Sequence, residues 1–288
     1  MKKQISLFAL MAVILSACNN KANDVIVNDD GIVKPKAPKA EGFKRILFMG
    51  NNLTEYYVSA PTLFQELCNA NNQYMNVQQL VTMGVPLDKV YETNKTEANQ
   101  NFSNRDKDGN YYDYVVLQES IPISLTNLEK YRSNLKMIVQ KIHKNSPDAA
   151  IYIYQPAPPV GYTNSNYKDC YDELRRNSLL AMVFINNAGL LRVGDAINDA
   201  YEGKNNYNYL INNKDNLRNE NNAFYFLNDG GFLQATLLYA TIFNQKPIIP
   251  RKLLLTTGIE DTDCMRKQEV AKAITNSNAL LEIAYSNR

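Results

Sequence analysis

The sequence predicts a three-layer α/β/α fold with a mostly parallel, five-stranded sheet. Short apolar segments that end at glycine, proline or polar residues alternate with longer segments whose apolar residues recur at helical spacing. The short segments are nearly continuous in their apolar character, which is typical of strands buried on both faces of a parallel sheet. An alternating order of strands and helices places helices on both faces of such a sheet.

The individual elements follow in a regular order. The first strand is expected at residues 44–50 (Lys-Arg-Ile-Leu-Phe-Met-Gly), and Tyr112–Leu117 is the clearest strand by its β-branched and aromatic content. The other expected strands are Val77–Met83, Ala150–Tyr154 and Leu190–Val193, and the expected helices are Ala60–Asn71, Leu125–Lys144, Tyr167–Asn187, Phe232–Phe243 and Arg266–Tyr285. Residues 201–222 have little periodicity and are expected to form a long loop with at most a short helix.

The N-terminal segment is expected to direct the chain to a membrane. Lys2 and Lys3 precede an apolar stretch that is too short to span a bilayer, as in a signal peptide at residues 1–17. The run Leu-Ser-Ala-Cys at 15–18 resembles the lipobox of bacterial lipoproteins, which implies cleavage before Cys18 and lipidation of its thiol. The alternative is an ordinary secretory signal that contains a cysteine by chance. Several acyl chains on Cys18 would give a stable membrane anchor.

Residues 18–42 are expected to form a flexible tether, because they are polar and end in a proline-rich, lysine-rich run. By the habit of bacterial lipoproteins, Asn19 after the cysteine suggests sorting to the outer membrane. Whether the domain then faces the periplasm or the outside stays open. Residues 43–288 are expected to form one domain, since no second linker or internal repeat follows.

Composition argues against several classes of function. The formal charge is +2 without a basic stripe, so nucleic acid is not an expected partner. His143 is the only histidine, and Cys68, Cys170 and Cys264 form no metal-binding pattern, so neither a metal nor a cofactor is expected. The three cysteines leave open one disulfide or only free thiols.

Five segments, in order, resemble the motifs of the SGNH (GDSL) hydrolases. They are Gly-Asn-Asn-Leu-Thr at 50–54, Val-Thr-Met-Gly at 81–84, Val-Val-Leu-Gln-Glu-Ser at 115–120, Arg-Val-Gly-Asp-Ala at 192–196 and Asn-Asp-Gly-Gly-Phe-Leu at 228–233. The resemblance implies an SGNH-like or flavodoxin-like fold, with its site at the carboxyl ends of the strands. It also implies a serine nucleophile in the first motif, backbone and side-chain oxyanion donors in the next two, and an Asp-x-x-His pair in the last.

The sequence departs from this pattern at the two residues that carry the chemistry. The serine position holds Asn52 and the histidine position holds Phe232, whereas Asp229 keeps the acid position. The resemblance makes Gly84 the backbone oxyanion donor and Gln118 the side-chain donor. Without serine or histidine, such a triad loses most of its rate.

The expected function is therefore binding of a carbohydrate or ester ligand by a catalytically impaired site. The candidate ligand-binding residues are Asn51, Asn52, Thr54, Gly84, Gln118, Glu119 and Asp229. Tyrosines at 56, 57, 111, 112, 162 and 167 are expected near the same face, where they either pack or stack on sugar rings. The alternatives are an active carbohydrate esterase that uses non-standard residues, and a non-enzymatic structural subunit of a surface complex. The carboxylates of Glu119 and Asp229 could serve acid–base work on a glycoside, but nothing in their spacing indicates that they converge. No protein partner is indicated.

Overall fold

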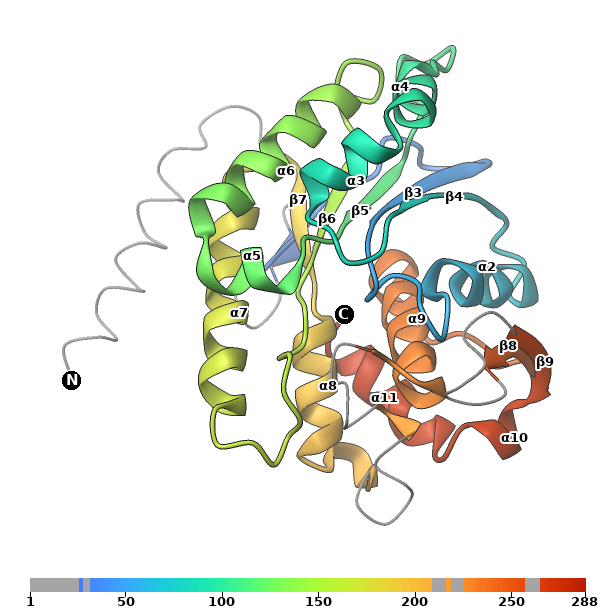
Figure 1. The fold of residues 1–288 in the computed structure, drawn as a ribbon. Helices are drawn as coiled ribbons and strands as arrows, with labels where there is room; N and C mark the ends of the chain where they lie inside the picture. Colours follow the sequence, from blue (N-terminus) through green and yellow to red (C-terminus); the bar gives the residue numbers. More distant parts are fainter. Residues whose placement is uncertain (1–25, 28–31, 209–215, 219–224, 257–264) are drawn as a thin grey trace. The chain divides into compact units, whose positions relative to one another are not determined.

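The computed structural model describes all residues except 1–25, 28–31, 209–215, 219–224 and 257–264 (Figure 1). The chain forms two compact units, Met1–Lys34 and Pro35–Arg288. In the first unit, the short strands β1 (Ile26–Val27) and β2 (Val33–Lys34) pair in antiparallel fashion. The expected signal peptide and Cys18 lie outside the described residues.

The second unit contains the predicted parallel sheet. Its strands are β3 (Lys44–Gly50), β4 (Met75–Val81), β5 (Tyr114–Leu117), β6 (Ala150–Tyr154) and β7 (Ala188–Leu191), in the spatial order β4-β3-β5-β6-β7. All four pairings are parallel. Every residue of β5, β6 and β7 is buried, as expected for strands covered on both faces. The predicted fold class is confirmed.

Helices cover both faces of the sheet (Figure 1). One layer holds α2 (Ala60–Ala70), α8 (Val193–Tyr201), α9 (Asn228–Phe243) and α11 (Ser277–Ser286), which pack against one another. The other holds α3 (Leu87–Thr93), α5 (Ile121–Thr126), α6 (Leu128–Ile142) and α7 (Tyr167–Met182), with α4 (Lys95–Ser103) beside α3. Almost all side chains of α9 are buried, so this helix forms the centre of its layer.

Two expected helices differ from the structure. The helix expected at 125–144 begins only at Leu128, as α6, because Asn127 ends the separate helix α5 and its side chain accepts a hydrogen bond from the Lys130 amide at the start of α6. The segment expected as a helix at 266–285 begins as strand β9 (Met265–Glu269), followed by α10 (Val270–Ala273) and α11. Strand β9 pairs with β8 (Lys252–Thr256), so tertiary pairing overrides a weak helical pattern.

The compact domain begins at Pro35 rather than at Phe43. Lys39, in the segment expected as tether, contacts Asp106 at 2.9 Å and the buried Asp113 at 3.5 Å. The backbone amide of Lys36 donates to Asn187. The last part of the expected tether therefore belongs to the domain. Among the described residues, no helix has the length and apolar character needed to cross a bilayer.

Candidate functional site

The first and third motifs meet at the carboxyl ends of β3 and β5. Gln118 lies directly after β5, and its Oε1 accepts hydrogen bonds from the Asn51 amide at 2.8 Å and from Thr54 Oγ1 at 3.0 Å. Its Nε2 donates to Asn51 Oδ1 at 2.8 Å and to the Glu119 carbonyl at 2.7 Å. A Cβ at position 50 would lie 2.3 Å from Thr54 Oγ1, so Gly50 allows this close packing. Both amide protons of Gln118 are therefore engaged inside the protein, which leaves none for an oxyanion.

Asn52, at the serine position, contacts the second motif. Its Oδ1 accepts the backbone N–H of Gly84 at 2.5 Å. The resemblance assigns this N–H to the oxyanion hole, and here a side chain of the protein occupies it. Of the sequence-predicted site residues, Asn52 is half-buried and Gly84 is exposed, so these two can meet a ligand directly.

The carboxylate of Glu119 is buried and joins neighbouring segments through hydrogen bonds. It accepts from the Leu87 amide at 3.0 Å, the Ser120 amide at 2.6 Å and Asn134 Nδ2 at 2.7 Å. Burial raises the pKa of this carboxyl, and the hydrogen bonds oppose that effect. Glu119 thus joins the end of β5 to the start of α3 and to α6.

The last motif forms the first turn of α9 instead of a loop. The buried Asp229 accepts from Tyr207 at 2.7 Å, Asn216 at 2.8 Å and the Thr275 amide at 2.9 Å. Burial raises the pKa of its carboxyl. No hydrogen bond between described residues joins Asp229 to Asn52 or Gln118. Phe232 is fully buried in the hydrophobic core, in keeping with its side chain.

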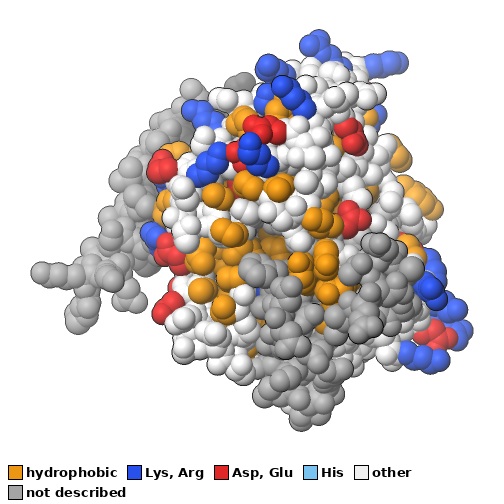
Figure 2. All heavy atoms as spheres, viewed as in Figure 1, with side chains coloured by type: hydrophobic (Ala, Val, Ile, Leu, Met, Phe, Trp, Pro, Cys, Tyr) orange, Lys and Arg blue, Asp and Glu red, His pale blue; other side chains and the backbone are white. Residues whose placement is uncertain are grey.

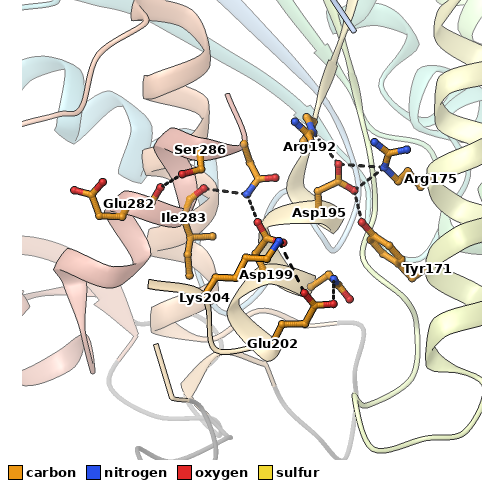
Figure 3. A network of polar contacts seen from close by, with 12 residues as sticks. Tyr171, Arg175, Arg192, Asp195, Asp199, Glu202, Lys204, Glu282, Ile283 and Ser286 are labelled. Carbon is orange, nitrogen blue, oxygen red and sulfur yellow. Dashed lines mark hydrogen bonds and ion pairs between the residues drawn. The ribbon is translucent and has the colours of Figure 1, made fainter. Parts of the chain in front are cut away.

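The segment at 192–196 forms a buried polar network (Figure 3). Asp195 at the start of α8 accepts from Gln155 Nε2 at 2.6 Å, Arg192 Nε at 2.7 Å and Tyr171 at 2.9 Å, and Arg175 lies 3.3 Å away. Burial alone would raise the pKa of Asp195, but the two guanidinium charges and these hydrogen bonds outweigh it and hold the pKa below its usual range. In the second part of the network, Asp199 contacts Lys204 at 2.6 Å. Asp195 fixes the loop after β6 to helices α7 and α8.

Apolar side chains gather around a hollow near the middle of the face where the strands end (Figure 2). Among the half-buried apolar residues that pack against the core, five lie in segments that follow the strands or precede α9, namely Tyr56, Leu125, Val160, Tyr162 and Tyr225. The rings of Tyr56 and Tyr225 stack with centroids 4.0 Å apart. In contrast, Tyr111 and Tyr112 precede β5 and lie at the opposite end of the sheet, where the Tyr111 ring contacts Arg45.

The described residues form no acyl-transfer triad. His143 caps the C-terminus of α6, where burial lowers its pKa, far along the chain from any motif. The described part of the chain has no group of side chains able to hold a metal ion. Cys68 and Cys170 are free thiols, and burial raises the pKa of both; Cys264 lies outside the described residues. Glu119 and Asp229 share no described hydrogen bond, since each carboxylate has its own partners.

Sequence reasoning missed Arg218, a fully buried arginine before α9, and Gln155, the partner of Asp195. Arg218 lies in the segment of low periodicity, where no pattern distinguishes it from its neighbours in the sequence. Gln155 follows the fourth predicted strand, and that position alone could have indicated it.

Comparison with known proteins supports the fold. No protein-family model matches the sequence, and a search of curated proteins finds no match. Among solved structures, a DUF4886 family protein from Bacteroides uniformis is similar, with a TM-score of 0.59 and 14% identity over 85% of this chain and 94% of that one. A candidate SGNH hydrolase from Slackia heliotrinireducens (TM-score 0.54, 18% identity) and the lipase/acylhydrolase from Enterococcus faecalis (0.50, 14%) align over 70% and 72% of this chain and all of their own. The chain therefore has the fold of the SGNH hydrolases.

Proposed function

We propose, from the premise that this chain has the SGNH hydrolase fold, that it binds a carbohydrate or ester ligand without hydrolysing it. The observation that carries the proposal is the hydrogen bond from the Gly84 amide to Asn52 Oδ1. In an active site of this fold, that amide would stabilise the negative oxygen of the reaction intermediate. Here Asn52 stands at the nucleophile position, and its side-chain oxygen also accepts the hydrogen bond of the Gly84 amide.

The position of the expected base supports the same interpretation. Phe232 cannot accept a proton, and its ring is fully buried in the hydrophobic core. Asp229, which would orient a histidine, instead binds Tyr207, Asn216 and Thr275. At these two positions the side chains therefore contribute to packing and hydrogen bonding and do not form an acid–base pair.

The rim of the site favours a carbohydrate. Tyr56, Tyr162 and Tyr225 have half-buried aromatic rings, and they lie in segments that follow the strands or precede α9. An aromatic face combined with a hydroxyl group suits the apolar face and polar edge of a sugar ring. We further propose that lipidation at Cys18 anchors the protein in the bacterial cell envelope, in the outer membrane.

The test uses the full-length protein in a polyoxyethylene alkyl ether detergent, which contains neither sugar nor ester. Hydrolysis of p-nitrophenyl acetate and of acetylated xylo-oligosaccharides is measured beside binding of neutral and acidic oligosaccharides by calorimetry. We expect no turnover and measurable saccharide binding that Tyr56→Ala weakens. Turnover by the parent protein, whether or not it survives Asp229→Asn, would overturn the proposal in favour of an active esterase. Absence of any saccharide or ester binding would overturn it in favour of a structural subunit.

A pair of variants tests the disarmed site directly. Asn52→Ser/Phe232→His restores both family residues, and Asn52→Ala/Phe232→His is the matched control with the same change in the core but no nucleophile. Hydrolysis by the first variant alone would support a site that is catalytically inactive because of the residues at these two positions. Equal hydrolysis by both variants would show that the introduced serine is not the nucleophile and would count against the proposal.

A further inference from the structure

Three large apolar side chains are exposed near the amino-terminal ends of β3 and β4. Phe43 (56% exposed) directly precedes β3, and Tyr74 (61% exposed) directly precedes β4. Because the parallel register pairs the first residues of these two strands, Phe43 and Tyr74 occupy neighbouring positions at this end of the sheet. Ile248 (76% exposed) exchanges hydrogen bonds of 2.7 and 2.9 Å with the side chain of Asn71, just before Tyr74. Phe43, Tyr74 and Ile248 are called the amino-end patch below.

Exposed apolar side chains are unevenly distributed between the two ends of the strands. Besides the amino-end patch, the described residues have three other exposed large apolar side chains. Val183 and Phe184 lie in the connection from α7 to β7, which also leads into the amino end of a strand. Met83 follows β4 and is adjacent to Gly84 of the candidate site. Single exposed apolar residues are normal on a protein surface, but several that gather at one end indicate a surface that meets an apolar partner.

The chain also enters the compact domain at this end of the sheet. The backbone of Lys36 exchanges hydrogen bonds of 3.0 and 2.9 Å with the side chain of Asn187, which precedes β7. Lys39 then contacts Asp113, which precedes β5, at 3.5 Å. The segment therefore crosses the amino-terminal end of the sheet before it enters β3. With the anchor proposed at Cys18, the start of the domain lies at most roughly 60 Å from the bilayer, the length of the extended chain between them.

Lysines without ion-pair partners accompany the patch. Residues 36–45 contain four basic residues and one acidic residue. Two of the four, Lys39 and Arg45, pair with Asp106. The other two, Lys36 and Lys44, belong to none of the ion pairs found among the described residues, and Lys44 directly follows Phe43. Lysines of this kind are attracted to anionic lipid headgroups.

We infer that the amino-terminal end of the sheet faces the membrane, and that the amino-end patch contacts the interface of the phospholipid bilayer. Aromatic rings and lysines suit this interface, because their apolar parts meet the acyl chains while their polar ends stay among the headgroups and water. The inference rests on the lipid anchor proposed at Cys18 and does not depend on which ligand the protein binds. It directs the carboxyl ends of the strands, which carry the candidate site, away from the bilayer.

The experiment uses tryptophan fluorescence, because the chain contains no tryptophan and a single introduced one reports only on its own position. Full-length protein isolated from bacterial membranes and carrying Phe43→Trp is reconstituted into vesicles of phosphatidylethanolamine and phosphatidylglycerol, with or without bromine on the acyl chains. The matched control is Met83→Trp, at an exposed apolar position that follows a strand. Flotation of the vesicles measures anchoring separately from the fluorescence.

We expect brominated lipid to lower the emission of the tryptophan at position 43 by about twofold or more, because interfacial residues lie about 5–10 Å into the boundary between headgroups and acyl chains. The emission of the Met83→Trp control should not change. Addition of Tyr74→Ser and Ile248→Ser to the Phe43→Trp variant should reduce the quenching without changing flotation. All these positions are exposed, so the substitutions leave the core intact.

The outcomes separate the membrane-facing surface from the anchor. Protein that floats with the vesicles but shows no quenching at position 43, or equal quenching at positions 43 and 83, would overturn the surface while the anchor stands. Protein that does not float would overturn the anchor and this inference together, whereas saccharide binding in detergent would stand or fall by its own test. A blue-shifted emission at position 43 without quenching would show that a protein, such as a second copy of this chain, covers the patch, and would refute the contact with lipid.

Discussion

Replacement of Asp195 by asparagine should destabilise the domain strongly. The carboxylate is 2% exposed and has four donors within 3.3 Å, from Gln155, Arg192, Tyr171 and Arg175. Breaking a buried ion pair by removal of one partner costs about 3–5 kcal/mol. The side chains of Arg192 and Arg175 are 14% and 29% exposed and can partly regain water, so we expect the lower end of this range, about 3 kcal/mol.

The assay is urea unfolding at pH 7, followed by far-ultraviolet circular dichroism. With a denaturant dependence of about 2–3 kcal/mol per molar urea, a loss of about 3 kcal/mol lowers the midpoint by about 1 M or more. The matched control is Asp172→Asn, which removes an exposed carboxylate that pairs with Lys168 on the same helix. Its effect should stay within about 0.5 kcal/mol.

The pH dependence supplies an independent check on Asp195. Its pKa is lowered in the folded protein, so its contribution is fully present above the unfolded-state pKa of about 3.9. The contribution is lost as the pH falls from there through the lowered pKa. The stability difference between the parent and Asp195→Asn should therefore shrink below about pH 4. An Asp195→Asn variant as stable as Asp172→Asn, or a difference that grows on acidification, would refute the reasoning.

Two further predictions concern packing and a buried acid. A Cβ at Gly231 would lie 2.4 Å from Val58 Cγ1, so Gly231→Ala should lower the free energy of unfolding by about 1–3 kcal/mol. The added effect of Gly231→Ala should be smaller in a Val58→Ala background, and an equal effect there would contradict the proposed clash. Burial raises the pKa of Glu119 in the folded protein, so on a rise in pH the unfolded chain loses this proton at a lower pH than the folded protein does. The free energy of unfolding of the parent protein should therefore decline as the pH rises from about 4.3 through the raised pKa. Denaturation across this range should show a weaker decline for Glu119→Gln than for Glu129→Gln, an exposed control; equal slopes would contradict the assignment.

The sheet could be predicted from the sequence because most of its strands are buried on both faces. Their apolar runs at 44–50, 112–117 and 150–154 carry the signal in the residues themselves. Helices α3, α4, α5 and α8 were not predicted, since each spans nine residues or fewer. The hairpin pairs the apolar strand β8 with the polar strand β9, whose residues resemble an exposed helix, so no local pattern reveals this pairing.

The candidate site was predictable in position but not in its contacts. Parallel strands bring Asn51 and Gln118 to one edge, so their meeting follows from topology. The capture of the Gly84 amide by Asn52 depends on a side-chain rotamer that sequence does not encode locally. Asp229 turned out to bind Tyr207 and Thr275, whose approach depends on segments distant in the chain.

The hydrogen bond between Asn52 and Gly84 also bears on how such a site could change over time. In an active oxyanion hole, the backbone N–H donor has no partner within the resting protein and is hydrated until substrate binds. Keeping a functional group available in this way commonly costs stability. In this chain the donor is satisfied in the resting state, so the loop after β3 and the turn after β4 support each other without a ligand. A serine at position 52 would give up this contact, so Asn52→Ser should loosen the link between the two segments. Under the proposed function, the asparagine at this position exchanges an available donor for a loop and a turn that hold together without a ligand.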